Sequence, residues 1–115
     1  MNQMHNKPNQ SKHWLNEVLQ IILSRIDDPS LTISKLAREV YMSERQFYRK
    51  IKETTGKTPN RFLQSIRMKK AQEILENKQP NSIKEVALSV GYTRTDYFSR
   101  LYESIHGKRP EYYFT

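Results

Sequence analysis

The stretch ISKLAREVYM at residues 33–42 decides the fold, because it returns as IKEVALSVGY at residues 83–92. The likeness continues downstream, where GKTP at residues 56–59 returns as GKRP at residues 107–110. Each copy predicts a short apolar helix, a tight turn and then a longer amphipathic helix. This is the outline of a helix-turn-helix unit, and the chain contains it twice.

The spacing of apolar residues and helix-ending signals predicts an all-α fold of seven helices, with no strand. Residues 1–10 are polar and aperiodic, and we expect them to be a disordered lead-in, a linker or a tag remnant. We assign 11–115 to one domain: 11–57 form the first unit with its leading helix, 58–78 a connector helix, and 79–115 the second unit. The expected helices span about 11–26, 33–40, 44–55, 59–77, 83–90, 94–106 and a last short turn at 110–114.

The charge balance favours a polyanionic partner. The 115 residues contain 20 Lys and Arg against 12 Asp and Glu, which gives a net charge of +8. Residues 32–79 hold 12 basic and five acidic side chains, a net of +7, whereas residues 80–115 hold five and four, a net of +1. Such an excess suits neutralisation of phosphates, and it is concentrated in the first unit and the connector.

Several classes of site are not expected. The chain has no Cys, which excludes disulfides, Cys-based zinc sites and a Cys nucleophile. Its three histidines, His5, His13 and His106, lack the spacing of metal ligands. No apolar run reaches the roughly 18 residues of a membrane span. We therefore expect no metal, no cofactor and no catalytic residue, and we expect a cytoplasmic protein.

The helix expected at 44–55 has two distinct faces. At 100° per residue, one face gathers four side chains within about 100° of arc: Arg45, Tyr48, Arg49 and Lys52. Phe47 and Ile51 lie on the opposite side. Arg can pair with guanine in the major groove, and Lys or Tyr can reach phosphates. An Arg/Lys stripe is usually only a solvated face, but here it lies on the second helix of a helix-turn-helix in a basic chain. The DNA contacts expected from this helix are Arg45, Gln46, Tyr48, Arg49 and Lys52.

The helix expected at 94–106 should expose Asp96, Ser99, Arg100 and Glu103, with Phe98, Leu101, Tyr102 and Ile105 turned inward. Asp96 has two possible roles: it can accept from a cytosine amino group, or it can hold Arg100 in place. The DNA contacts expected from this helix are Arg94, Thr95, Asp96, Ser99 and Arg100. Phosphate contacts are expected at Thr32, Ser43, Lys50, Lys57 and Ser82.

These motifs together resemble the DNA-binding domain of the AraC/XylS transcription regulators, over about residues 13–114. The resemblance rests on LA at 36–37, MSxRxFxRKI at 42–51, TGKTP at 55–59, RMxxAxxxL at 67–75, IxxVAxxVGY at 83–92 and YFSR at 97–100, where x is any residue. It implies two helix-turn-helix units joined by a linking helix, with both recognition helices inserted into successive major grooves. Two positions depart from the family pattern: Phe114 stands where the family usually has Arg, and Tyr41 stands where the second copy has Gly91.

The sequence therefore predicts a sequence-specific transcription regulator that binds double-stranded DNA and is not an enzyme. We expect it to be the output domain of a larger protein with a sensor or receiver domain, and RNA polymerase is a further candidate partner. A small stand-alone activator is the alternative. A helical protein-interaction module would instead expose an apolar patch in place of the Arg45 and Arg49 face. RNA is less favoured, because its deep and narrow A-form major groove does not admit a helix.

Overall fold

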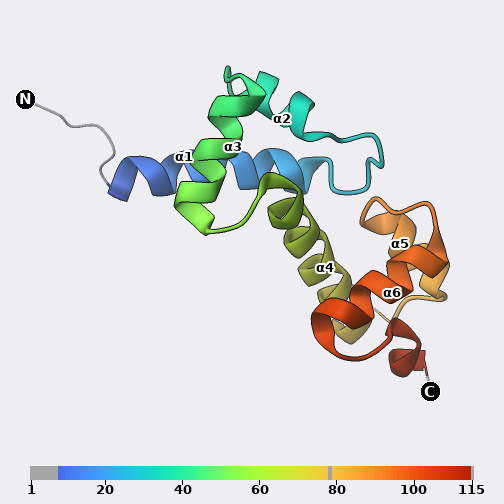
Figure 1. Ribbon diagram of the computed structural model, residues 1–115. Coiled ribbons are helices and arrows are strands. Elements are labelled where there is room, and N and C mark those ends of the chain that lie inside the picture. Colours follow the sequence, from blue (N-terminus) through green and yellow to red (C-terminus); the bar gives the residue numbers. More distant parts are fainter. Residues whose placement is uncertain (1–7, 78, 115) are drawn as a thin grey trace, which may run out of the picture. The chain divides into compact units, whose positions relative to one another are not determined.

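The computed structural model describes residues 8–77 and 79–114, with side chains from Lys12 onward (Figure 1). All regular structure in this part of the chain is helical, which confirms the all-α prediction. Of the seven helices expected, six are α-helices and the last is a 3-10 turn. No helix in residues 8–77 and 79–114 is long and apolar enough to cross a membrane. The elements are α1 (Pro8–Ser24), α2 (Ile33–Glu39), α3 (Glu44–Thr55), α4 (Pro59–Asn77), α5 (Ile83–Ser89), α6 (Thr95–His106) and η1 (Pro110–Phe114).

The first helix begins earlier than the sequence pattern predicted. We expected a lead-in over residues 1–10, but α1 starts at Pro8. Proline suits the first turn of a helix, since its missing N–H has no partner there in any case. Residues 1–7 of the expected lead-in lie outside the described residues.

Helices α3 and α5 begin at predicted capping residues, and α3 ends at a predicted glycine. At the start of α3 the Ser43 hydroxyl accepts from the Gln46 N–H at 3.1 Å, and the Gln46 side chain accepts from the Ser43 N–H at 3.0 Å. This reciprocal pair is a capping box, which satisfies two backbone donors that the helix leaves free. Ser82 caps α5 by accepting from the Glu85 N–H at 3.1 Å. Gly56 ends α3 in the left-handed conformation, with φ of 78°.

The chain divides into two compact units, each with its own core. The first contains the residues up to Arg25 together with Leu31–Leu63. In it α1 packs against α2 and α3, and the Trp14 ring meets the Phe47 ring edge-on at 5.8 Å between centroids. Arg25 forms an ion pair with Glu39. The buried apolar side chains of this unit include Val18, Ile22, Leu31, Leu36, Phe47, Ile51 and Leu63.

The second unit contains Ile26–Ser30 and the residues from Gln64 onward. Its aromatic centre is Tyr102, whose hydroxyl donates to Tyr113 at 3.1 Å. Burial, together with that hydrogen bond, raises the pKa of Tyr102. The centres of the His106 and Tyr102 rings lie 4.4 Å apart. The His106 Nε2 lies 3.1 Å from the carbonyl oxygen of Met68 in α4. The core of this unit comprises Met68, Ala71, Leu75, Val86, Ala87, Val90, Phe98 and Tyr102.

Arg67 of α4 holds the loop after α1 in the second unit. Its side chain is buried, its Nη2 donates to the Asp28 carbonyl at 2.8 Å, and its guanidinium lies 5.6 Å from the centre of the Tyr92 ring. We expected this loop to belong with residues 11–57, but it clusters with the second unit. The reason is a bond between residues 39 positions apart in sequence, which no local pattern reveals.

The two helix-turn-helix turns have the same backbone despite their different residues. Tyr41 has φ of 60° and Gly91 has φ of 89°, so both adopt the left-handed conformation. In both turns the next N–H bonds to the corresponding alanine carbonyl, Met42 to Ala37 at 2.9 Å and Tyr92 to Ala87 at 2.8 Å. The phenol of Tyr41 projects almost wholly into solvent, with 96% of the residue exposed. The first turn therefore accommodates a bulky residue by leaving its side chain free of the fold.

Gly91 is required by its surroundings as well as by its φ. A Cβ added there would lie 2.7 Å from the Ile26 carbonyl oxygen and 2.7 Å from the Arg67 Nη2. Gly107, which ends α6 in the same unit with φ of 81°, has nothing within 4 Å of an added Cβ. The two glycines thus separate the cost of a left-handed conformation from the cost of overlap.

We expect Gly107→Ala to lower the free energy of unfolding by about 1–2 kcal/mol, the cost of a left-handed residue with a Cβ. Gly91→Ala adds steric overlap with a carbonyl and a buried guanidinium, so its cost should be larger by roughly 1–3 kcal/mol. Urea unfolding followed by circular dichroism measures both. Equal losses in the two variants would show that the Arg67 contact does not constrain the second turn.

Candidate nucleic-acid interface

The outer face of α3 gathers the side chains that the sequence pattern placed there. Arg45, Tyr48, Arg49 and Lys52 are all exposed, while Phe47 and Ile51 on the other side are buried. Within residues 8–77 and 79–114, the three cations make no ion pair with an acidic side chain. The helix therefore presents two guanidiniums and an ammonium that are all available to an anionic partner.

A shallow groove borders this face at the start of α4. Arg45 and Tyr48 line it from α3, Pro59 and Asn60 line it from α4, and Thr58 lines it from the residue before α4. Thr58 caps α4 by accepting from the Arg61 N–H at 3.3 Å. Our sequence-based prediction did not include Asn60. Its position in the first turn of a capped helix was the one signal that could have suggested it, because such turns favour anions.

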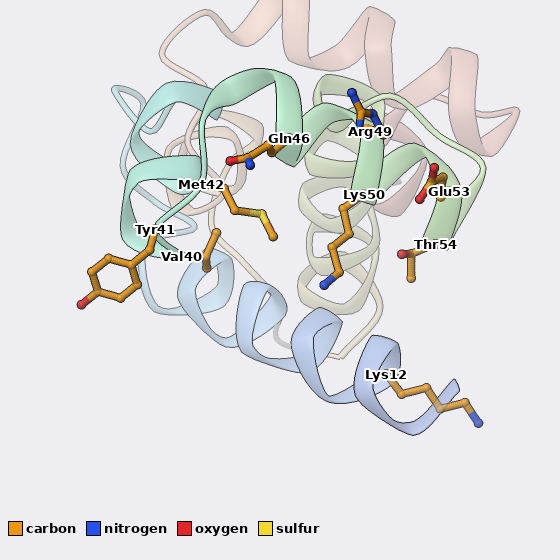
Figure 2. A pocket seen from close by; sticks show the side chains of 9 residues that line it. All are labelled: Lys12, Val40, Tyr41, Met42, Gln46, Arg49, Lys50, Glu53 and Thr54. Atoms are coloured by element: carbon orange, nitrogen blue, oxygen red, sulfur yellow. The ribbon is translucent and has the colours of Figure 1, made fainter. Parts of the chain in front are cut away.

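Lys50 lies on a different side of α3 from the arginines. Figure 2 shows its side chain reaching toward α1 while Arg49 points away from α1. The ammonium sits 4.7 Å from the centre of the Trp14 ring, a cation–π contact within the first unit. This placement gives no support to the phosphate contact expected of Lys50. Periodicity alone placed Lys50 next to the exposed arc, and only the packing of α1 shows which way it turns.

The other expected phosphate contacts lie at exposed positions. Lys57 follows α3 and is exposed. The hydroxyls of Thr32, Ser43 and Ser82 each accept a backbone N–H of the helix that they cap. A hydroxyl that accepts one hydrogen bond still has its own hydrogen to donate. Capping is therefore compatible with a phosphate contact at all three positions, which remains a prediction. The same holds for Gln46, whose amide NH₂ is left free when its carbonyl oxygen accepts in the capping box.

In the second unit the exposed face of α6 is narrower than expected. Arg94, Asp96 and Arg100 are exposed and Thr95 is half-buried, but Ser99 is only 2% exposed. The Ser99 hydroxyl lies 3.3 Å from a carboxylate oxygen of Glu111, to which it donates. The expectation that α6 exposes Ser99 is therefore wrong.

The cause is η1, which packs against α6 and covers this side of the helix. Ile105, expected inward, is instead 44% exposed.

Asp96 lies between two arginines at the start of α6. Its Oδ2 accepts from Arg94 Nη2 at 3.1 Å and lies 3.7 Å from Arg100 Nη1. The hydrogen bond from Arg94, followed by that from the Tyr97 N–H, lowers the pKa of the Asp96 carboxyl. Its pair with Arg100 is the arrangement expected of the second role that the sequence left open, and contact with a cytosine remains a prediction.

Comparison with known proteins places this geometry in a family. A family model described as a helix-turn-helix domain matches residues 36–115. The solved C-terminal domain of AraT, a response regulator from Geobacillus stearothermophilus, is 31% identical with a TM-score of 0.78, over 85% of this chain and 80% of that one. The chain belongs to the AraC-type helix-turn-helix family. The resemblance stated from the sequence motifs is thereby confirmed.

Two further relatives of this AraC-type chain bear on its context. The DNA-binding domain of AdpA, a global transcriptional factor solved in complex with a target DNA, is 29% identical with a TM-score of 0.78, over 86% of this chain and 87% of that one. Histidine kinase P4 of Formosa agariphila is 28% identical over 86% of this chain, which spans 7% of the kinase. The chain spans about a third or less of the length of the curated relatives that it matches.

The C-terminal segment of this AraC-type chain is partly packed and partly exposed. Tyr113 is half-buried against Tyr102, whereas Tyr112 and Phe114 are 60% and 42% exposed. Lys108 Nζ lies 4.3 Å from the centre of the Tyr112 ring. Phe114, at the position where the family usually has Arg, thus adds an exposed apolar ring in place of a charge.

The burial of Ser99 leads to a prediction that separates it from its exposed neighbour. Ser99→Ala removes one hydrogen bond inside the second unit, so it should lower the free energy of unfolding by about 0.5–1.5 kcal/mol. Because the hydroxyl is covered, affinity for duplex DNA should stay within about two-fold of the unmodified chain. Thermal unfolding and polarisation titrations measure the two effects. A large loss of affinity with unchanged stability would mean that η1 moves away and exposes Ser99.

Proposed function

We propose that this chain is the DNA-binding part of a longer transcription regulator, which inserts α3 and α6 into successive major grooves of double-stranded DNA. The observation that carries the proposal is that the second helix of each helix-turn-helix unit exposes an arginine at the equivalent position, Arg49 and Arg100. Membership of the AraC-type family and the DNA complex of the AdpA domain support it.

The exposed chemistry suits base reading combined with phosphate contact. An arginine can pair bidentately with O6 and N7 of guanine, and each such pair contributes about 1–3 kcal/mol of discrimination. Lys52 and Lys57 carry point charges suited to phosphates, which fix the register without reading sequence. Tyr48 offers a phenol at the same face of α3, where 49% of the residue is exposed.

The parent protein is the second part of the proposal. AraT is described as a response regulator, and the P4 relative is a histidine kinase many times longer than this chain. These relatives favour an output domain attached to a sensor or receiver domain over a small stand-alone activator. On this proposal the full-length protein acts in the cytoplasm, and RNA polymerase is its second macromolecular partner.

A three-way binding experiment tests the proposal. Bound duplexes are first selected from a random library, and the best site is then titrated as duplex DNA, as single-stranded DNA and as RNA. We expect the duplex to bind most tightly, and a scrambled duplex to bind about 10³-fold or more weakly, the lower end for specific binders. Equal affinity for the selected duplex, the scrambled duplex, single-stranded DNA and RNA would indicate non-specific binding by a cationic protein. That result would contradict the proposal.

Replacing the equivalent arginines tests base reading. Arg49→Ala and Arg100→Ala should each weaken binding to the selected site by roughly 1–3 kcal/mol and relax the preference at one or two base pairs. The measurement is a titration of each variant against single-base variants of the site. An unchanged ratio between selected and scrambled duplexes would make both arginines phosphate contacts or spectators.

Two lysines of α3 provide a matched pair for the salt dependence. Lys52→Gln removes an exposed cation on the proposed contact face, so the slope of log K against log salt should flatten by up to about one unit. Lys50→Gln removes an equal charge on the side that faces Trp14, and Lys84→Gln removes one from α5; both should change the slope less. A larger effect at Lys50 than at Lys52 would mean that the DNA backbone runs along α1.

A further inference from the structure

The two recognition helices carry opposite charges at two equivalent positions, Arg45 against Asp96 and Lys52 against Glu103. With the offset of 51 residues that aligns Arg49 with Arg100, Arg45 of α3 corresponds to Asp96 of α6. Arg45 joins Arg49 and Lys52 on a face of α3 that Glu53 borders, whereas Asp96 places a carboxylate between two arginines. A carboxylate repels DNA phosphates, so its presence on the proposed contact face of α6 requires an explanation.

The surroundings of Asp96 restrain it from three directions. Its carboxylate accepts from Arg94 Nη2 at 3.1 Å, lies 3.7 Å from Arg100 Nη1 and accepts the backbone N–H of Tyr97. Asp96 is also in the first turn of α6, where the helix dipole favours a negative charge. The carboxylate thus lies between two long side chains that are otherwise exposed to solvent.

Both arginines keep donors for a second partner. A guanidinium has five N–H donors in a planar fork, and pairing with one carboxylate leaves the rest of the fork open. Holding the fork in one orientation also reduces the rotamer freedom that would be lost on binding. At the same time, one negative charge between two positive ones weakens the attraction of this face for any phosphate.

We propose that Asp96 is a positioning residue for specificity: it orients Arg94 and Arg100 toward base edges and reduces indiscriminate phosphate binding by α6. This inference rests on the proposed function, because it requires that α6 contacts DNA. It assigns the two recognition helices different tasks, with the unpaired cations of α3 supplying salt-dependent affinity and the bridged arginines of α6 supplying discrimination.

The test compares Asp96→Asn with Glu103→Gln on the selected duplex and on a scrambled duplex. Glu103 is an exposed acid of the same helix, and within residues 8–77 and 79–114 its side chain forms no ion pair. Both variants lose one negative charge, so both should bind the scrambled duplex more tightly. Only Asp96→Asn should lower the ratio of selected to scrambled affinity, by at least roughly five-fold, the scale of one lost discriminating contact.

A double-mutant cycle separates positioning from direct base reading. In a chain that carries Arg94→Ala and Arg100→Ala, Asp96→Asn should leave the affinity ratio unchanged, because there is no guanidinium left to orient. The same five-fold loss in that background would mean that Asp96 itself accepts from a cytosine, and would overturn the inference. An unchanged ratio for Asp96→Asn in the otherwise unmodified chain would overturn it as well.

Two further measurements keep the outcomes distinct. Asp96→Glu keeps the charge and should retain most of the ratio, and thermal unfolding of every variant identifies any loss of the fold. If the unmodified chain shows no preference for duplex over single strands, the proposed function fails first. If it shows that preference and Asp96→Asn matches Glu103→Gln in every binding measurement, only the role of Asp96 fails.

Discussion

The buried guanidinium of Arg67 is the interaction on which the second helix-turn-helix unit most depends. Removing a cation from water is costly unless polar partners replace its hydration. Here the replacements are the Asp28 carbonyl at 2.8 Å and the face of the Tyr92 ring, while Nε has no hydrogen-bond partner in the described part of the chain. The guanidinium thereby joins the loop at 26–30 and the turn before α6 to the α4 helix. Gly91 completes this arrangement, since any Cβ at that position would occupy the space that Arg67 fills.

The predictable part of the structure is the part specified by local chemistry. The capping box of Ser43 and Gln46, the cap at Ser82 and the left-handed Gly56 each involve groups within a few residues of one another. The buried stripe of Phe47 and Ile51 also follows from helical spacing alone. These features determine where helices begin and end and which face is inward, so they were accessible from the sequence.

The differences between the expected and the observed placements arise where distant segments meet. Ser99 has the spacing of an exposed residue, but a turn that begins eleven residues later covers it. Lys50 borders the cationic arc of α3, but its ammonium contacts the ring of Trp14 on another helix. The loop at 26–30 follows the first helix in sequence but is bonded to Arg67. Each outcome depends on which surface the second segment occupies, and periodicity within one helix contains no such information.

The two units show how one backbone can serve two purposes. The turn geometry is the same whether Tyr41 or Gly91 occupies the left-handed position, so it is set by the hydrogen bonds of the turn and not by the identity of that residue. What differs is the space around it: open at Tyr41 and filled at Gly91. The exposed side chains of α3 and α6 likewise support little of either core. A change from Arg45 to an aspartate at the equivalent place therefore alters what a partner meets without altering the helix that presents it.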